Sequence, residues 1–86
     1  MKTIKILTEV SEYLSNRYSI ALEDFYVVSY SHFRVSLQGT FNSVISKKLH
    51  DSDVPITIDD NGYCCATIKL DLIDSSYVNI EIILTS

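Results

Sequence analysis

The sequence predicts one small α+β domain in which two helices pack against an antiparallel sheet of about five strands, in the order α-β-β-α-β-β-β. Apolar residues recur at helical spacing in two segments and alternate with polar residues in the remaining segments. Only two Gly and one Pro interrupt the chain, which favours regular elements joined by a few loops. A chain of 86 residues has room for a single domain, which we place at residues 1–86.

Two segments have the periodicity of amphipathic helices. The first spans about residues 4–18 and the second about residues 41–50, with Thr40 or Asn42 as the expected N-cap of the second. Lys47, Lys48 and His50 fall in its last turn, where positive charge suits the helix dipole. The apolar positions are Ile4, Leu7, Val10, Leu14 and Tyr18 in the first helix, and Phe41, Val44, Ile45 and Leu49 in the second.

Residues 24–38 predict a β-hairpin whose register the sequence leaves open. The second strand alternates, with Phe33, Val35 and Leu37 on one face, and Gly39 is expected to end it. The first strand, 25–29, is apolar on both faces. If Phe25 and Val27 join the core, they lie opposite Leu37 and Val35. The opposite face would then combine Tyr26, Val28, Tyr30, His32 and Arg34.

Alternation is clearest in the C-terminal half. Placing Asp60-Asn61-Gly62 in a three-residue loop keeps Ile58 opposite Cys64 and Ile56 opposite Ala66, with Gly62 left-handed. A two-residue loop would mix the two faces. A second loop at residues 74–76 leads to a last strand in which we expect Leu70 opposite Ile80 and Lys69 opposite Glu81.

Charge and targeting signals restrict the classes of function. The net charge is −4 and the seven basic residues are scattered, so nucleic-acid binding is not expected. No apolar run reaches the roughly 18 residues of a membrane span, and the N-terminus lacks the apolar stretch of a signal peptide. We therefore expect a cytoplasmic protein. Cys64 and Cys65 are adjacent, so we expect two free thiols, Cys64 inward and Cys65 outward.

No pattern of residues predicts catalysis. Phosphate-binding loops, nucleophile elbows and zinc-protease signatures are absent from the sequence. His32 and His50 are expected on the solvated surface, and His50, Asp51 and Asp53 lack the spacing of a metal site. We therefore predict neither an enzyme, nor a cofactor, nor a metal site.

The mixed face of Tyr26, Val28, Tyr30, His32 and Arg34 is the candidate binding surface, because Tyr and Arg anchor many protein interfaces. An ordinary, partly covered sheet face would explain the same residues. We hypothesise a small regulator or inhibitor that occludes the surface of a larger protein, such as a phage or mobile-element accessory protein of the anti-CRISPR type. A single-stranded nucleic-acid-binding domain on the same face remains an alternative. A self-assembling subunit is another, forming a homodimer through the C-terminal strand, Tyr77–Leu84, as an exposed edge.

Overall fold

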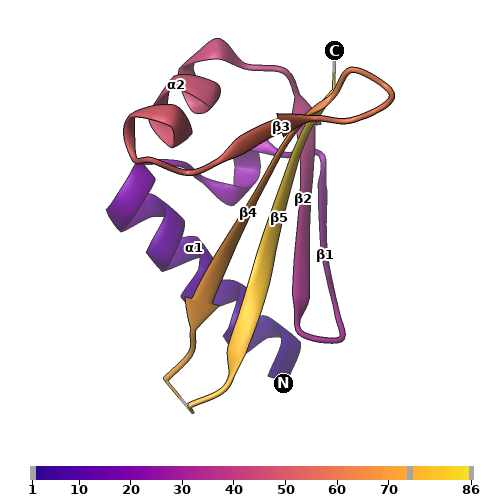
Figure 1. The fold of residues 1–86 in the computed structure, drawn as a ribbon. Coiled ribbons are helices and arrows are strands. Elements are labelled where there is room, and N and C mark those ends of the chain that lie inside the picture. Colours follow the sequence, from indigo (N-terminus) through magenta and orange to yellow (C-terminus); the bar gives the residue numbers. More distant parts are fainter. Residues whose placement is uncertain (1, 74, 86) are drawn as a thin grey trace.

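The computed structural model describes residues 2–73 and 75–85, with side chains from residue 4 onward, and confirms the predicted α+β class and element order (Figure 1). The helices are α1 (Lys2–Tyr18) and α2 (Ser43–Asp51), with a short 3-10 helix, η1 (Leu22–Asp24), after α1. The strands are β1 (Val27–Ser31), β2 (Arg34–Thr40), β3 (Ile56–Ile58), β4 (Cys64–Asp71) and β5 (Tyr77–Thr85).

The sheet has five strands and is mostly antiparallel, as predicted, with one parallel pair. Its strand order is β1-β2-β5-β4-β3, and β5 runs parallel to β2 while every other neighbouring pair is antiparallel. The chain leaves β2 through α2, resumes at the far edge in β3, and returns toward β2 through two hairpins. The C-terminal strand therefore lies between β2 and β4. The expectation that this strand forms an exposed edge, on which the alternative of a homodimer depended, was wrong.

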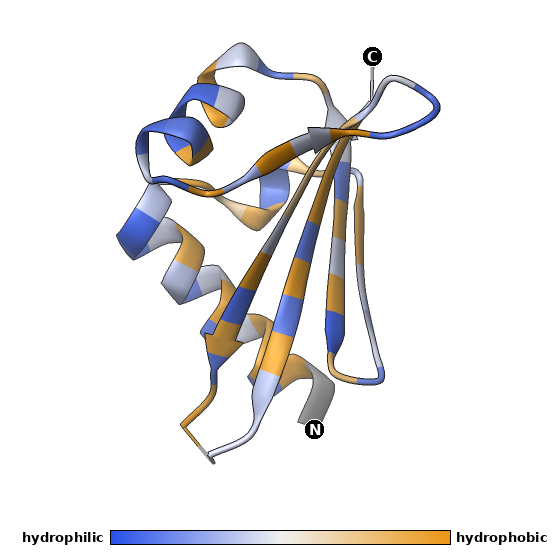
Figure 2. Cartoon of the chain, in the orientation of Figure 1, coloured by the Kyte–Doolittle hydropathy of each residue, from blue (hydrophilic) through white to orange (hydrophobic). Residues whose placement is uncertain are grey.

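Both helices cover the same face of the sheet and share one core with it. Apolar and polar residues alternate along β4 and β5, so each strand turns its apolar side toward the helices (Figure 2). On α1 the predicted stripe is displaced at its start: Ile6 is buried, whereas Ile4 is 62% exposed. The core residues are Ile6, Val10, Leu14, Tyr18, Ile20, Phe25, Val35, Leu37, Ile45, Leu49, Ala66, Ile68, Leu72, Val78, Ile80, Ile82 and Leu84.

The second helix begins where one of its two expected caps lies. The Asn42 side-chain oxygen accepts hydrogen bonds from the backbone N–H groups of Val44 at 2.8 Å and Ile45 at 3.4 Å. These bonds satisfy two donors that have no partner within the helix. Asn42 is therefore the cap, and Ile45 and Leu49 form the buried side of α2 while Val44 is exposed.

The first hairpin has a different register from the expected one. Its loop has only two residues, His32 and Phe33, with φ angles of +48° and +63°. Two successive positive φ angles are the geometry of a type I′ turn, whose twist suits a tight hairpin. The turn places Val28 opposite Leu37 and Tyr30 opposite Val35, so the pairing of Phe25 and Val27 with these residues was wrong. Phe25 is nevertheless buried in the core, whereas Val27 is exposed.

Gly39 was expected to end the second strand, but it lies within that strand. It pairs with Leu84 of β5, and β2 continues to Thr40. A Cβ atom at residue 39 would lie 3.0 Å from Cδ1 of Phe25 and 3.2 Å from the carbonyl oxygen of Asp24. Glycine is therefore needed because the segment before β1 crosses directly over this position.

The C-terminal hairpins confirm the predicted strand faces. Ile58 pairs with Cys64 and Ile56 with Ala66, and Gly62 closes the three-residue loop with a φ of +82°. The β4–β5 pairing differs from the expected one, because Leu70 lies opposite Val78 and Lys69 opposite Asn79. The Leu72 N–H donates to the Ser76 carbonyl at 2.8 Å, which closes the turn earlier than expected. Asp74, in the expected loop, lies outside the described residues.

Candidate functional site

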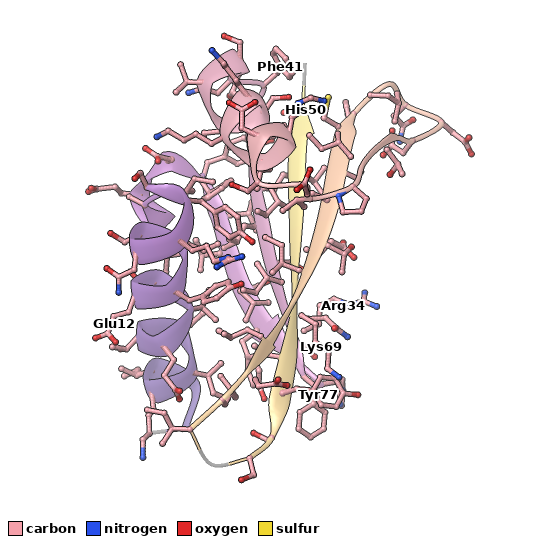
Figure 3. The ribbon with its side chains drawn as sticks, turned by 60° about the vertical axis from the view of Figure 1, so that its left-hand side comes forward. Glu12, Arg34, Phe41, His50, Lys69 and Tyr77 are labelled. Atoms are coloured by element: carbon pink, nitrogen blue, oxygen red, sulfur yellow. The ribbon has the colours of Figure 1, made fainter. Side chains whose placement is uncertain are left out.

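The structure separates the five residues that were predicted to share one binding face. Val28 and Tyr30 lie on the side of β1 that faces the helices, because their partners in β2 are core residues. Arg34 points away from the helices, on the open face of the sheet (Figure 3). The prediction that these residues share one face was wrong, because it depended on the hairpin register. Their role in binding stays a prediction.

The other two residues lie at opposite ends of β1. His32 occupies the β1–β2 turn and is exposed. Tyr26 precedes the strand, and its hydroxyl forms a hydrogen bond with the Thr85 hydroxyl at 3.0 Å. Together, Tyr26, Val28, Tyr30 and His32 therefore follow the length of one strand rather than one face of the sheet.

That strand, β1, is a free edge of the sheet, since β2 is its one neighbour in the described part of the chain (Figure 1). The type I′ turn makes Ser31 and Arg34 a hydrogen-bonded pair, and such pairs alternate along an antiparallel ladder. Ser29 and Ser31 therefore direct their backbone groups toward β2. The N–H and C=O groups of Val28 and Tyr30 point outward, where another strand could bind them.

The two edges of the sheet differ in how well they are protected. Natural proteins block edge strands with charges, prolines or short length. Strand β3 has three residues and follows Pro55. Strand β1 has five residues, Val-Val-Ser-Tyr-Ser, with no charged residue and no proline, and the Val28 side chain is 37% exposed. Strand β1 is therefore the better template for an added strand.

An apolar groove lies along one flank of α1, next to η1, on the helix side of the sheet. It has a volume of about 310 Å³ and is lined by Ile4, Leu7, Thr8, Ser11, Glu12 and Leu22. The opposite flank of α1 faces the β4–β5 loop, because a carboxylate oxygen of Glu9 accepts a hydrogen bond from the Ile73 N–H at 3.1 Å. The groove lies on the other flank of α1, and it reaches Leu22 of η1, the segment that leads into β1.

A second pocket lies on the open side of the same hairpin. It has a volume of about 350 Å³ and is lined by Ser31, His32, Arg34 and Ser36. Among the side chains of residues 4–73 and 75–85, the one close contact between a basic and an acidic group joins His50 and Asp51 at 3.7 Å, so Arg34 has no carboxylate within 4.0 Å there. The pocket therefore offers hydroxyl groups and an unpaired guanidinium to an incoming group.

An aromatic cluster adjoins this pocket and was missed by the sequence reasoning. The rings of Phe33 and Tyr77 stack with centroids 6.1 Å apart, and the Lys69 Nζ lies 4.8 Å from the Tyr77 centroid. Phe33 was expected in the core, but the turn leaves it 49% exposed. Phe33 reaches β5 only because of the hairpin register. The alternation of apolar and polar residues therefore could not predict this contact.

The two cysteines are free, as expected, and lie on opposite faces of β4. Burial raises the pKa of the Cys65 thiol, and the nearby Asp59 carboxylate raises this pKa further. The Cys65 Sγ lies 3.8 Å from Oδ2 of Asp59, as a donor to that carboxylate. A raised pKa keeps the thiol protonated at neutral pH, which makes Cys65 a poor nucleophile.

Side chains that could bind a metal ion do not cluster in the described part of the molecule. Among the described residues, no group of three or more His, Cys, Asp or Glu side chains is placed to bind a metal ion. In the same described part, neither α1 nor α2 has the length and apolar character to cross a membrane.

Comparison with known proteins finds no matching family model, curated protein or solved structure. The candidate site is therefore the β1 edge with its flanking groove and pocket.

Proposed function

We propose that this chain is a small non-enzymatic regulator or inhibitor that binds an extended segment of a larger protein by strand addition to β1. The observation that carries the proposal is the unprotected edge, where the backbone groups of Val28 and Tyr30 point outward. Strand addition uses such groups for affinity, while pockets for alternate side chains provide specificity. Capture of the segment would withhold it from its normal contacts, which is inhibition by occlusion.

A protein partner is favoured over nucleic acid by the charges on the open face. Arg34 and Lys69 share that face with Asp71 and Glu81, so these four residues give the face no surplus of positive charge. The whole chain carries a net charge of −4. Binding to a phosphate backbone depends on a surplus of positive charge, which this arrangement does not supply.

Substitution of Val28 by Pro tests the proposal. Proline removes the outward N–H of residue 28 but none of the bonds to β2, so the fold should persist. A strand bound at the edge would lose one donor, and its unpaired carbonyl would cost about 1–3 kcal/mol, or about 5- to 150-fold in affinity. The measurement is the affinity of extended peptides selected from a random display library on the wild-type chain.

Ile58→Pro is the matched control, because Ile58 lies on β3 at the other edge of the sheet and is exposed. We expect this variant to bind the selected peptides as the wild type does. Amide exchange of the wild-type complex should show new protection at Val28 and Tyr30. If no peptide is selected, or if Val28→Pro binds with unchanged affinity, strand addition at β1 is wrong.

A further inference from the structure

We infer that the segment bound at β1 carries an acidic side chain that pairs with Arg34, and apolar side chains at alternating positions that enter the groove beside α1. This inference rests on the proposed function and specifies the chemistry of the partner. It follows from two hollows on opposite sides of the sheet, the groove between α1 and η1 on the helix side and the Arg34 pocket of the β1–β2 hairpin on the open side.

The alternation of a β-strand assigns the side chains of the bound segment to two sides. Successive residues point to opposite faces of the sheet, so an added strand presents every second side chain to the helix side. There it would meet Val28 and Tyr30 of β1 and the exposed side chain of Ile4 in the groove. These neighbours are mostly apolar, so burial of apolar side chains from the partner would be favourable.

The remaining side chains of the added strand would lie over the open face of β1. The residues of β1 on this face include Ser29 and Ser31, and Ser31 pairs directly with Arg34 in the next strand. Neighbouring strands are about 4.8 Å apart, so an added strand lies about 10 Å from β2. Because the intervening serines are short, a glutamate from the partner and the long Arg34 side chain can meet above them.

The chemistry of the pocket selects an anion. Arg34 is exposed and has no carboxylate within 4.0 Å in the described residues, so its guanidinium donors are available. A guanidinium binds a carboxylate or a phosphate through two parallel hydrogen bonds. The hydroxyl groups of Ser31 and Ser36 line the same pocket as further donors. An aspartate, a glutamate and a phosphoserine share this chemistry.

Peptide selection on the Arg34→Glu variant tests the inference. Peptides selected on the wild-type chain should alternate apolar residues with one acidic position, and those selected on the variant should carry Lys or Arg at that position. The wild-type peptides should bind the variant at least about tenfold more weakly, because like charges then face each other. Lys47→Glu on α2 makes the same change in charge at an exposed site away from β1 and should leave the preference unchanged.

Two further comparisons separate the outcomes. The selected peptide is made with glutamate, phosphoserine or glutamine at the acidic position, which distinguishes a carboxylate, a phosphate and a neutral side chain. Equal binding of the glutamine and glutamate peptides, or an unchanged preference in Arg34→Glu, overturns the inference while the proposed function stands if Val28 and Tyr30 are still protected. Selected peptides that protect neither amide overturn the proposed function and the inference together.

Discussion

Replacing Ile80 with Ala is expected to lower the free energy of unfolding by about 3–5 kcal/mol, the upper part of the range for buried aliphatic residues. Ile80 is 0% exposed at the centre of β5, where it pairs with Val35 on one side and Ile68 on the other. Truncation of its side chain leaves a cavity. The neighbouring strands β2 and β4 cannot close this cavity, because both are paired with β5. A domain of this size is stabilised by roughly 5–10 kcal/mol, so the loss is a large fraction of the total.

Urea unfolding followed by circular dichroism measures this effect. The matched control is Ile83→Ala, because Ile83 lies on the same strand but on the open face, where it is half-buried. We expect the control to lose about 1 kcal/mol or less, with an unchanged dependence on urea. Equal losses for the two variants would contradict the assignment of the two faces of β5.

Replacing Gly39 with Ala is expected to lower the free energy of unfolding by about 1–3 kcal/mol through overpacking. Alanine at an unstrained strand position would instead stabilise by about 0.4–1 kcal/mol, since it restricts the unfolded chain. The loss is expected because the new methyl group would meet the buried ring of Phe25 and the backbone oxygen of Asp24. Neither group can move without displacing the segment that leads into β1.

A double-mutant cycle with Phe25→Val isolates this contact. Valine has no δ carbon and so lacks the atom nearest to the new methyl group, so Gly39→Ala should cost less in the Phe25→Val background. Losses that simply add, or a gain in stability from Gly39→Ala alone, would show that Gly39 is not needed for the close approach.

The fold was predictable wherever alternation left one solution. In the β3–β4 hairpin, a single loop length kept Ile58 and Cys64 on the same face, and the structure has that loop. In the β4–β5 hairpin the faces were predicted correctly, but the pairing of Lys69 with Glu81 was wrong because a shift of two residues preserves the faces. Burial patterns therefore determine the faces but not always the partners.

The register of β1 could not be predicted because its turn has no signal in the residue types. Tight hairpin turns usually contain Gly, Asn or Asp, which adopt positive φ easily, but here His32 and Phe33 do so. The position of β5 beside β2 could not be predicted either, since this parallel pairing depends on the whole path of the chain. The candidate site moved from a sheet face to a sheet edge for these two reasons.

The most direct test of the account is the exchange rate of the backbone amides of β1 in the free protein, measured residue by residue with NMR. The proposed edge requires that the N–H groups of Val28 and Tyr30 point to solvent, while those of Ser29 and Ser31 bond to β2. We therefore expect fast exchange at residues 28 and 30 and slow exchange at residues 29 and 31. Slow exchange at Val28 and Tyr30 with fast exchange at the two serines would contradict the register and remove the binding edge.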